Sequence, residues 1–259
     1  MRGAIIAALI LAAATADARP RRFAIGQTGQ VTRGLMAYWA MRNSGTTVYD
    51  EWGANNGTAT NSPTFATSAG VVGAGAGVVG EYTSTGSYKG VVIGNPAALQ
   101  INSESSGVTI SAWVKLATVP SGGTQYGAIA GAGYLTAVNG YGLSVDQTNW
   151  RFQARVGATV ITAVSAHGSS AAWTHVAGVR TGGNCIIYVN GSTTASASGA
   201  LGDTTPTAQW SIGMRDVGTG TFAYGLNGAI DEVRIYNRAL SLDEIKQLYR
   251  MGATVYANR

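Results

Sequence analysis

The chain has 259 residues, a length that suits one all-β domain, and with 46% hydrophobic and only 11% charged residues it is not a disordered chain. A single cysteine excludes an internal disulfide bond. The net charge of +5 is diffuse, with no basic stripe of interleaved aromatic residues, so we expect no nucleic-acid partner. The 37 glycines, together with many Ser and Thr residues, favour strands and turns over helices.

The first 18 residues have the pattern of a secretory signal peptide. Arg2 precedes an apolar run from Ala4 to Ala14, and Ala16 and Ala18 supply the small residues of a cleavage site. We therefore expect a secreted protein, either extracellular, periplasmic or on the cell surface, and an uncleaved anchor is the alternative. No later segment offers the roughly 20 apolar residues of a membrane span.

The segment after the predicted cleavage site, residues 19–33, is a basic lead-in with arginines clustered at positions 19, 21 and 22. We expect one domain over residues 34–259. Its first part is rich in Gly, Ala, Asn and Thr, with short strand-like pieces at residues 35–39 and 46–49. Loops are expected to dominate there.

The clearest strand is VTISAWVKL, residues 108–116, in which apolar side chains alternate with polar ones. Strict alternation predicts a strand that is buried on one face only. Trp113 falls on the polar face, so we expect it to pack under a loop or the C-terminal helix, and a place in a ligand groove is the alternative.

The segment NWRFQARV, residues 149–156, repeats this alternation. Its apolar stripe faces the core, and its polar stripe faces water or a ligand, with Arg151, Gln153 and Arg155. Further on, CIIYVNG ends in Asn190 and Gly191, a dipeptide that favours a type I′ hairpin turn and a returning strand.

One helix is expected, near the C-terminus. Ser241 and Glu244 form a capping box, and Ile245, Leu248 and Tyr249 make an apolar stripe that covers the sandwich. Many short strands with turns every roughly 8–12 residues predict an all-β fold of two packed antiparallel sheets.

Residues 225–249 closely resemble the closing segment of laminin-G-like domains in the concanavalin A-like lectin/glucanase superfamily. Their sequence is GLNGAIDEVRIYNRALSLDEIKQLY. Four further stretches follow that family's order: LMAYWAMRNSGTTVYDEWGANNGTA, VTISAWVKL, WTHVAGVR with CIIYVNG, and QWSIGM. The resemblance implies a jellyroll, usually in secreted or surface proteins that bind carbohydrate or another protein. The family often has acidic residues after the first aromatic strand, where this chain has Ala40, Met41, Arg42 and Asn43.

Catalysis is not expected. Polysaccharide-cleaving members of this fold carry Glu-x-Asp-x-x-Glu on one strand, and none of the twelve acidic residues forms that motif. Of the two histidines, His175 suits a hydrogen-bonded structural position and His167 lies in a Gly/Ser loop. Cys185 alternates with Ile187 as a small buried residue. A polysaccharide-active hydrolase or lyase with an atypical site remains the alternative.

A structural calcium ion is one hypothesis for the acidic residues. Alternation places Asp231 on the face of Val233 and Ile235, so its carboxylate requires either hydrogen-bond donors or a hard cation. In the resembling family, the loop that faces such an aspartate supplies oxygen ligands, and here that loop contains Asp50, Asn55 and Asn56. A hydrogen-bonded aspartate without metal is the other hypothesis.

Loop aromatic residues are the candidates for sugar stacking. Trp52 lies in the loop DEWGANNG, where the family usually has a small polar residue, and an exposed loop tryptophan favours a function. Weaker candidates are Tyr82, Tyr88, Tyr126 and Tyr134.

We thus expect a secreted, non-catalytic, lectin-like module that binds a glycan or polysaccharide, with calcium as an optional structural ion. The alternative is a structural or adhesion subunit of a cell surface or virion that contacts other proteins.

Overall fold

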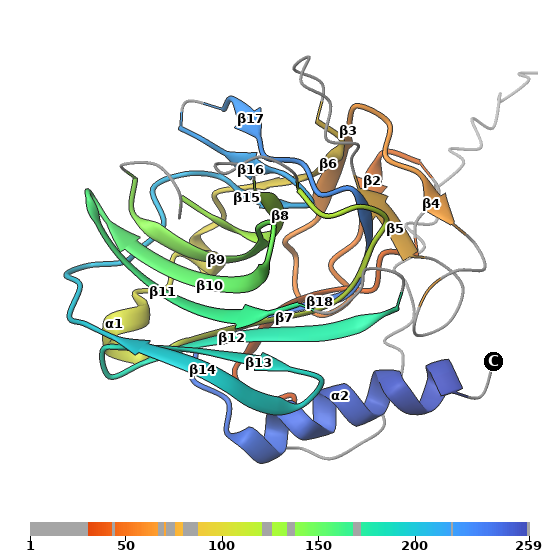
Figure 1. The fold of residues 1–259 in the computed structure, drawn as a ribbon. Helices are drawn as coiled ribbons and strands as arrows, with labels where there is room; N and C mark the ends of the chain where they lie inside the picture. Colours follow the sequence, from red (N-terminus) through yellow and green to blue (C-terminus); the bar gives the residue numbers. More distant parts are fainter. Residues whose placement is uncertain are drawn as a thin grey trace, which may run out of the picture.

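The computed structural model describes residues 31–42, 45–66, 70, 76–79, 88–120, 126–133, 138–167, 172–218 and 220–257. Two sheets of eight strands lie face to face (Figure 1). The first, sheet A, has the order β14 (Ser192–Ser198), β13 (Asn184–Val189), β12 (Thr174–Thr181), β7 (Val108–Leu116), β18 (Gly228–Tyr236), β5 (Ala76–Val79) and β4 (Phe65–Ala66). Strand β1 (Leu35–Trp39) pairs with the second half of β18.

The second sheet, sheet B, has the order β11 (Thr159–Ala166), β10 (Asn149–Val156), β9 (Gly140–Val145), β8 (Gly127–Ala132), β15 (Trp210–Ile212), β6 (Gly90–Gly94), β3 (Gly57–Thr60) and β2 (Thr47–Val48). A small hairpin joins β16 (Arg215–Asp216) to β17 (Phe222–Ala223). The helical elements are η1 (Ala97–Leu99), α1 (Ser103–Ser106) and α2 (Leu242–Ala257). The predicted all-β sandwich with a C-terminal helix is confirmed.

The core lies between the two sheets and follows the predicted alternation. Strand β7 contributes Val108, Ile110, Ala112, Val114 and Leu116. Strand β10 of sheet B contributes Trp150, Phe152 and Ala154. The two sheets approach so closely that a Cβ atom on Gly178 of β12 would lie 2.0 Å from Cδ2 of Phe152.

Most of the other face of β7 is also buried, with Lys115 as its exposed residue, so the prediction of a half-buried strand is wrong. Thr109 and Ser111 are fully buried and Trp113 is 3% exposed, because helix α2 covers this outer face of sheet A (Figure 1). Trp113 stacks on Tyr249 of α2, with ring centroids 5.6 Å apart. The packing of Trp113 under the helix, predicted from its place on the polar face, is confirmed.

The predicted hairpin and helix cap are both present. Asn190 and Gly191 have φ angles of 50° and 76°, the positive values of a type I′ turn, and β14 follows directly. At the start of α2, Glu244 N–H donates to Ser241 Oγ and Ser241 N–H donates to Glu244 Oε2. This reciprocal capping box begins the helix where the sequence predicts it.

Strand β18 contains a bulge that alternation does not predict. Its register shifts between Asp231 and Arg234, and Glu232 has a φ angle of 55°. Asp231 therefore pairs with Trp113, whose side chain lies on the α2 side, whereas Val233 and Ile235 remain in the core between the sheets. The prediction that Asp231 shares their face is wrong, because the extra residue reverses the alternation.

The predicted signal peptide and most of the basic lead-in lie outside the described residues, so they stay predictions. In the part of the chain that the structure covers, no helix has the length and apolar character needed to cross a membrane.

Candidate functional site

The loop after β2 is organised around Asp50, the first of the predicted metal ligands. Its Oδ1 accepts backbone N–H groups of Tyr38, Trp52 and Gly53, at 2.9–3.0 Å. Its Oδ2 accepts the backbone N–H and the side-chain amide of Asn55, at 3.0 and 2.9 Å. Backbone N–H donors thus compensate this buried carboxylate.

The other predicted ligands are also engaged. The Asn55 carbonyl accepts the Trp39 indole N–H, and Asn56 Oδ1 accepts the Asp50 N–H. Asp231 Oδ1 accepts the N–H of Glu232. Within the covered residues, no three His, Cys, Asp or Glu side chains converge. A calcium ion at Asp50 would have to displace these N–H donors, and the calcium hypothesis stays a prediction.

Of the predicted aromatic residues, the structure describes Trp52, Tyr88 and Tyr126, and no ring contact joins these three. Trp52 is 38% exposed at the Asp50 loop, as its sequence context predicts. Tyr88 is half-buried, and its backbone carbonyl accepts the side-chain amide of Asn61 at 2.7 Å. Tyr82 and Tyr134 lie outside the described residues. Among the three described candidates, Tyr126 is the one whose ring meets other groups suited to a ligand.

Tyr126 belongs to a cluster of alternating rings and guanidinium groups, which we call the Tyr-Arg cluster. It consists of Arg151, Tyr126, Tyr224 and Arg215. The Arg151 Cζ lies 5.1 Å from the Tyr126 ring centroid, and the Arg215 Cζ lies 4.1 Å from that of Tyr224. The two ring centroids are 6.1 Å apart, with the planes tilted by 53°. Both tyrosines are half-buried, so part of each ring meets solvent.

The turn between β9 and β10 positions Arg151. Asp146 Oδ1 accepts the N–H groups of Thr148 and Asn149, and its Oδ2 accepts Arg151 Nη1 at 2.6 Å. Burial alone would raise the pKa of the Asp146 carboxyl, but the Thr148 amide and the Arg151 guanidinium outweigh burial and lower that pKa below its ordinary 3.8. The turn thus holds Arg151 beside Tyr126 with an ionised partner.

Tyr224 follows the β16–β17 hairpin and has a φ angle of 58°, which is unusual for a bulky residue. Its carbonyl accepts the N–H of Ala128 in β8 at 2.8 Å, so the strained backbone is anchored to sheet B. Strain of this kind costs about 1–3 kcal/mol and is concentrated at functional sites. Within the hairpin, Asp216 Oδ1 accepts the N–H groups of Gly218 and Gly220.

The outer face of sheet B continues the site. Ser144 pairs with Arg151 across β9 and β10, and Gln153 lies two residues further along β10. Both are nearly fully buried, yet among the described residues Ser144 Oγ and Gln153 Oε1 have no hydrogen-bond partner. Because paired residues share a face, these atoms lie on the side of the Tyr-Arg cluster. These unpaired polar atoms therefore lie beneath the surface of this face, below the partly exposed tyrosine rings.

Sequence reasoning identified Tyr126 and the polar stripe of Arg151 but missed Tyr224 and Arg215. The polar stripe was the usable signal, because it predicts a face that meets water or a ligand. No local pattern marks Tyr224, because its hydrogen bond to β8 and its ring contact with Tyr126 join segments that lie far apart in the sequence.

Among the groups that could serve in catalysis, His175, Cys185 and Glu232 are buried. His175 is buried, its Nε2 lies 3.0 Å from Ser111 Oγ, and burial lowers its pKa to about 3. Cys185 is buried in the core, and burial raises the pKa of its thiol. Glu232 accepts the Tyr38 hydroxyl and the guanidinium groups of Arg42 and Arg234.

Comparisons with known proteins agree with this architecture. Comparison with curated proteins found no match. Among solved structures, the chain is similar to a mutant of Trypanosoma rangeli sialidase displaying trans-sialidase activity, with a TM-score of 0.60 and 17% identity over 86% of this chain and 34% of the sialidase chain. It is also similar to the binding domain of Paraclostridial Mosquitocidal Protein 1, with a TM-score of 0.65 and 16% identity over 85% of this chain and 53% of that chain.

A third similar structure is domain 4 of AbnA, an extracellular arabinanase from Geobacillus stearothermophilus, in complex with arabinotriose. Its TM-score is 0.54, with 18% identity over 83% of this chain and 98% of that domain. The chain thus spans about a third of the sialidase and about half of the toxin binding domain, and these low identities show the fold alone. A family model for the concanavalin A-like lectin/glucanases superfamily matches residues 84–246, more than half of the sequence, so the chain belongs to that superfamily.

Proposed function

We propose that this protein is a secreted, non-catalytic carbohydrate-binding module that binds a glycan through the Tyr-Arg cluster on the outer face of sheet B. The observation that carries the proposal is the pair of half-buried tyrosine rings at 6.1 Å, each with a guanidinium over it. Sugar rings present apolar C–H faces and hydroxyl edges, which suit aromatic rings beside hydrogen-bond donors.

The polar surroundings supply the specificity that ring contacts lack. Arg151 offers guanidinium N–H donors, and its side chain is 19% exposed. Ser144 and Gln153 lie on the same face, with their unpaired oxygens buried beneath its surface. A site of this kind binds with modest affinity, because only part of each ring is accessible. The proposal needs no calcium ion, since N–H donors satisfy Asp50.

The fold and one structural neighbour support this assignment. Lectins belong to the same superfamily, and the similar arabinanase domain was solved with arabinotriose bound. Secretion is supported by the signal-peptide pattern of residues 1–18. Mass spectrometry of the exported protein tests it, with a new N-terminus near Arg19 as the expected result.

A glycan array with the purified protein tests the function. We expect saturable binding to at least one glycan class and a loss of at least about fivefold in affinity for Tyr126→Ala, since a stacked aromatic contact contributes about 1 kcal/mol. Tyr88→Ala is the matched control and is expected to bind like wild type. If Trp52→Ala removes glycan binding while Tyr126→Ala does not, the Tyr-Arg cluster is not the binding site. Silence across all glycans contradicts the function, and turnover of a polysaccharide contradicts its non-catalytic character.

A second candidate function, adhesion to another protein, has one observation in its favour. Val160 and Val164 of β11, at the end of sheet B, are 38% and 41% exposed. Exposed apolar residues on an edge strand suit a protein contact. Binding to a protein surface that is lost in Val164→Lys but kept in Tyr126→Ala would favour this alternative.

A further inference from the structure

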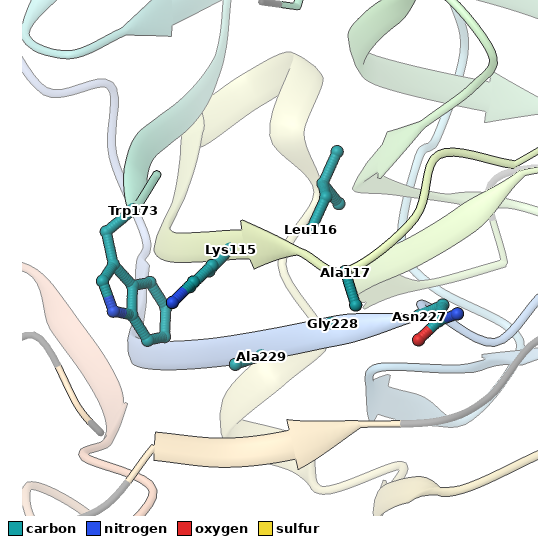
Figure 2. A pocket seen from close by; sticks show the side chains of 7 residues that line it. All are labelled: Lys115, Leu116, Ala117, Trp173, Asn227, Gly228 and Ala229. Atoms are coloured by element: carbon teal, nitrogen blue, oxygen red, sulfur yellow. The ribbon is translucent and has the colours of Figure 1, made fainter. Parts of the chain in front are cut away.

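A pocket of about 270 Å³ opens on the outer face of sheet A, away from the Tyr-Arg cluster. Figure 2 shows Trp173 and Lys115 toward one end of the pocket and Asn227 toward the other. Between them the floor is formed by small residues, namely Ala117, Gly228 and Ala229. Trp173 is only 7% exposed, so a small part of its indole meets the pocket, beside a floor that leaves space for a ring.

The pairing of β7 with β18 shapes this floor. Lys115 pairs with Ala229, and Leu116 pairs with Gly228. A Cβ atom on Gly228 would lie 2.2 Å from the Lys115 carbonyl oxygen and 3.0 Å from Leu116 Cα, so only glycine fits there. Trp173 is held in place by packing with Trp113 in the cluster beneath α2. The Trp173 side chain and the floor are therefore preformed.

The polar groups of the pocket are suited to an anion. Lys115 is exposed, and within the described part of the chain no carboxylate lies within ion-pair distance of its ammonium group. The Asn227 amide Nδ2 donates to Thr118 Oγ1 at 2.8 Å, which holds the amide at the rim. An ammonium group offers three donors and no acceptor, so it favours a negatively charged oxygen.

We infer that this pocket is a second sugar subsite, which takes one acidic pyranose with its ring over the small residues of the floor, beside the accessible part of Trp173, and with its carboxylate at Lys115. The pocket volume lies just below the roughly 300–1,000 Å³ of sites for drug-sized ligands, which suits a single ring rather than a chain of sugars. The inference rests on the proposed glycan-binding function, but it involves different residues and a different sheet.

The test is an NMR titration of the protein with glucuronic acid and with glucose. The two sugars differ only at C6, which is a carboxylate in glucuronic acid and a CH2OH group in glucose. The readout is the Trp173 indole N–H signal, identified by its loss in Trp173→Phe. We expect that signal to shift saturably with glucuronic acid, with about fivefold weaker binding of glucose at low salt. Lys115→Gln is expected to remove the preference, whereas Lys89→Gln, the matched lysine control, keeps it.

Three results overturn the inference: no shift of the Trp173 signal, equal affinity for the two sugars, or a preference that survives Lys115→Gln. The Tyr126→Ala variant separates this inference from the proposed function, because it is expected to lose array binding while it keeps the glucuronic acid titration. If the array shows Tyr126-dependent binding and the Trp173 signal does not move, the second subsite alone is wrong. If no glycan binds in either experiment, both are wrong.

Discussion

Replacing Gly178 by alanine tests how closely the two sheets pack. The new methyl carbon would lie 2.0 Å from Cδ2 and 2.3 Å from Cγ of Phe152, whereas ordinary contacts are 3.4–4 Å. The ring is fully buried, so it or the strand must shift by more than 1 Å. Overpacking of this kind costs about 1–3 kcal/mol, and a cost of about 2 kcal/mol corresponds to a fall in Tm of about 4–8 °C.

The double variant makes this prediction specific. In a Phe152→Leu background the smaller side chain relieves the clash, so Gly178→Ala is expected to cost at least about 1 kcal/mol less than in wild type. Gly202→Ala is the control, because nothing lies within 4 Å of its added carbon, and it is expected to change stability by less than about 0.5 kcal/mol. Denaturant unfolding measures the four free energies of the double-mutant cycle and that of Gly202→Ala. If the costs of Gly178→Ala and Phe152→Leu are strictly additive, the close packing of Gly178 on Phe152 is refuted. The same packing of β10 directs Arg151 to the outer face of sheet B.

Three further predictions concern buried charges and metal. Glu232→Ala leaves the buried guanidinium of Arg234 without its carboxylate, so denaturant unfolding should show a loss of about 3–5 kcal/mol; a loss below about 1 kcal/mol would contradict it. His175, whose folded-state pKa is lowered to about 3 by burial, takes up a proton in the unfolded chain below about pH 6.5 but not in the folded one. The contribution of His175 to the free energy of unfolding is therefore complete above that pH and is lost as pH falls toward 3. The free energy of unfolding changes by up to about 1.4 kcal/mol per pH unit in this range, and His175→Gln is expected to remove that slope. An unchanged slope in the variant would contradict the lowered pKa of His175. Chelation with EDTA is expected to leave Tm unchanged, because N–H donors already satisfy Asp50; a fall that added calcium restores would reinstate a metal at that loop.

The alternation of apolar and polar residues predicts most of the fold, because each sheet has one face in a common core. The strands around Phe152 and Ile110, the turn at Asn190 and the cap at Ser241 all depend on neighbours within a few residues. Such local rules lie within the reach of sequence reasoning. The burial of Trp113 under α2 required only the further step that a C-terminal helix covers a sheet.

The sequence-based predictions fail where one inserted residue reverses the alternation of a strand, and where segments far apart in the sequence form one site. Glu232 has a left-handed backbone and forms a bulge in β18 without a glycine, so the sequence gives no signal for the bulge. The bulge moves Asp231 to the other face of the sheet. The Tyr-Arg cluster combines Tyr126, Arg151 and Tyr224 from three separate segments. The pairings of β8 with β9 and of β9 with β10, together with the hydrogen bond from Ala128 to Tyr224, bring them together.

The most direct test of glycan binding at the Tyr-Arg cluster is a crystal structure of the protein with an oligosaccharide selected on the array. We predict a sugar ring in van der Waals contact with Tyr126 or Tyr224 and a hydrogen bond from Arg151 to a sugar oxygen. An oligosaccharide seated instead on Trp52, with the outer face of sheet B empty, would contradict the account.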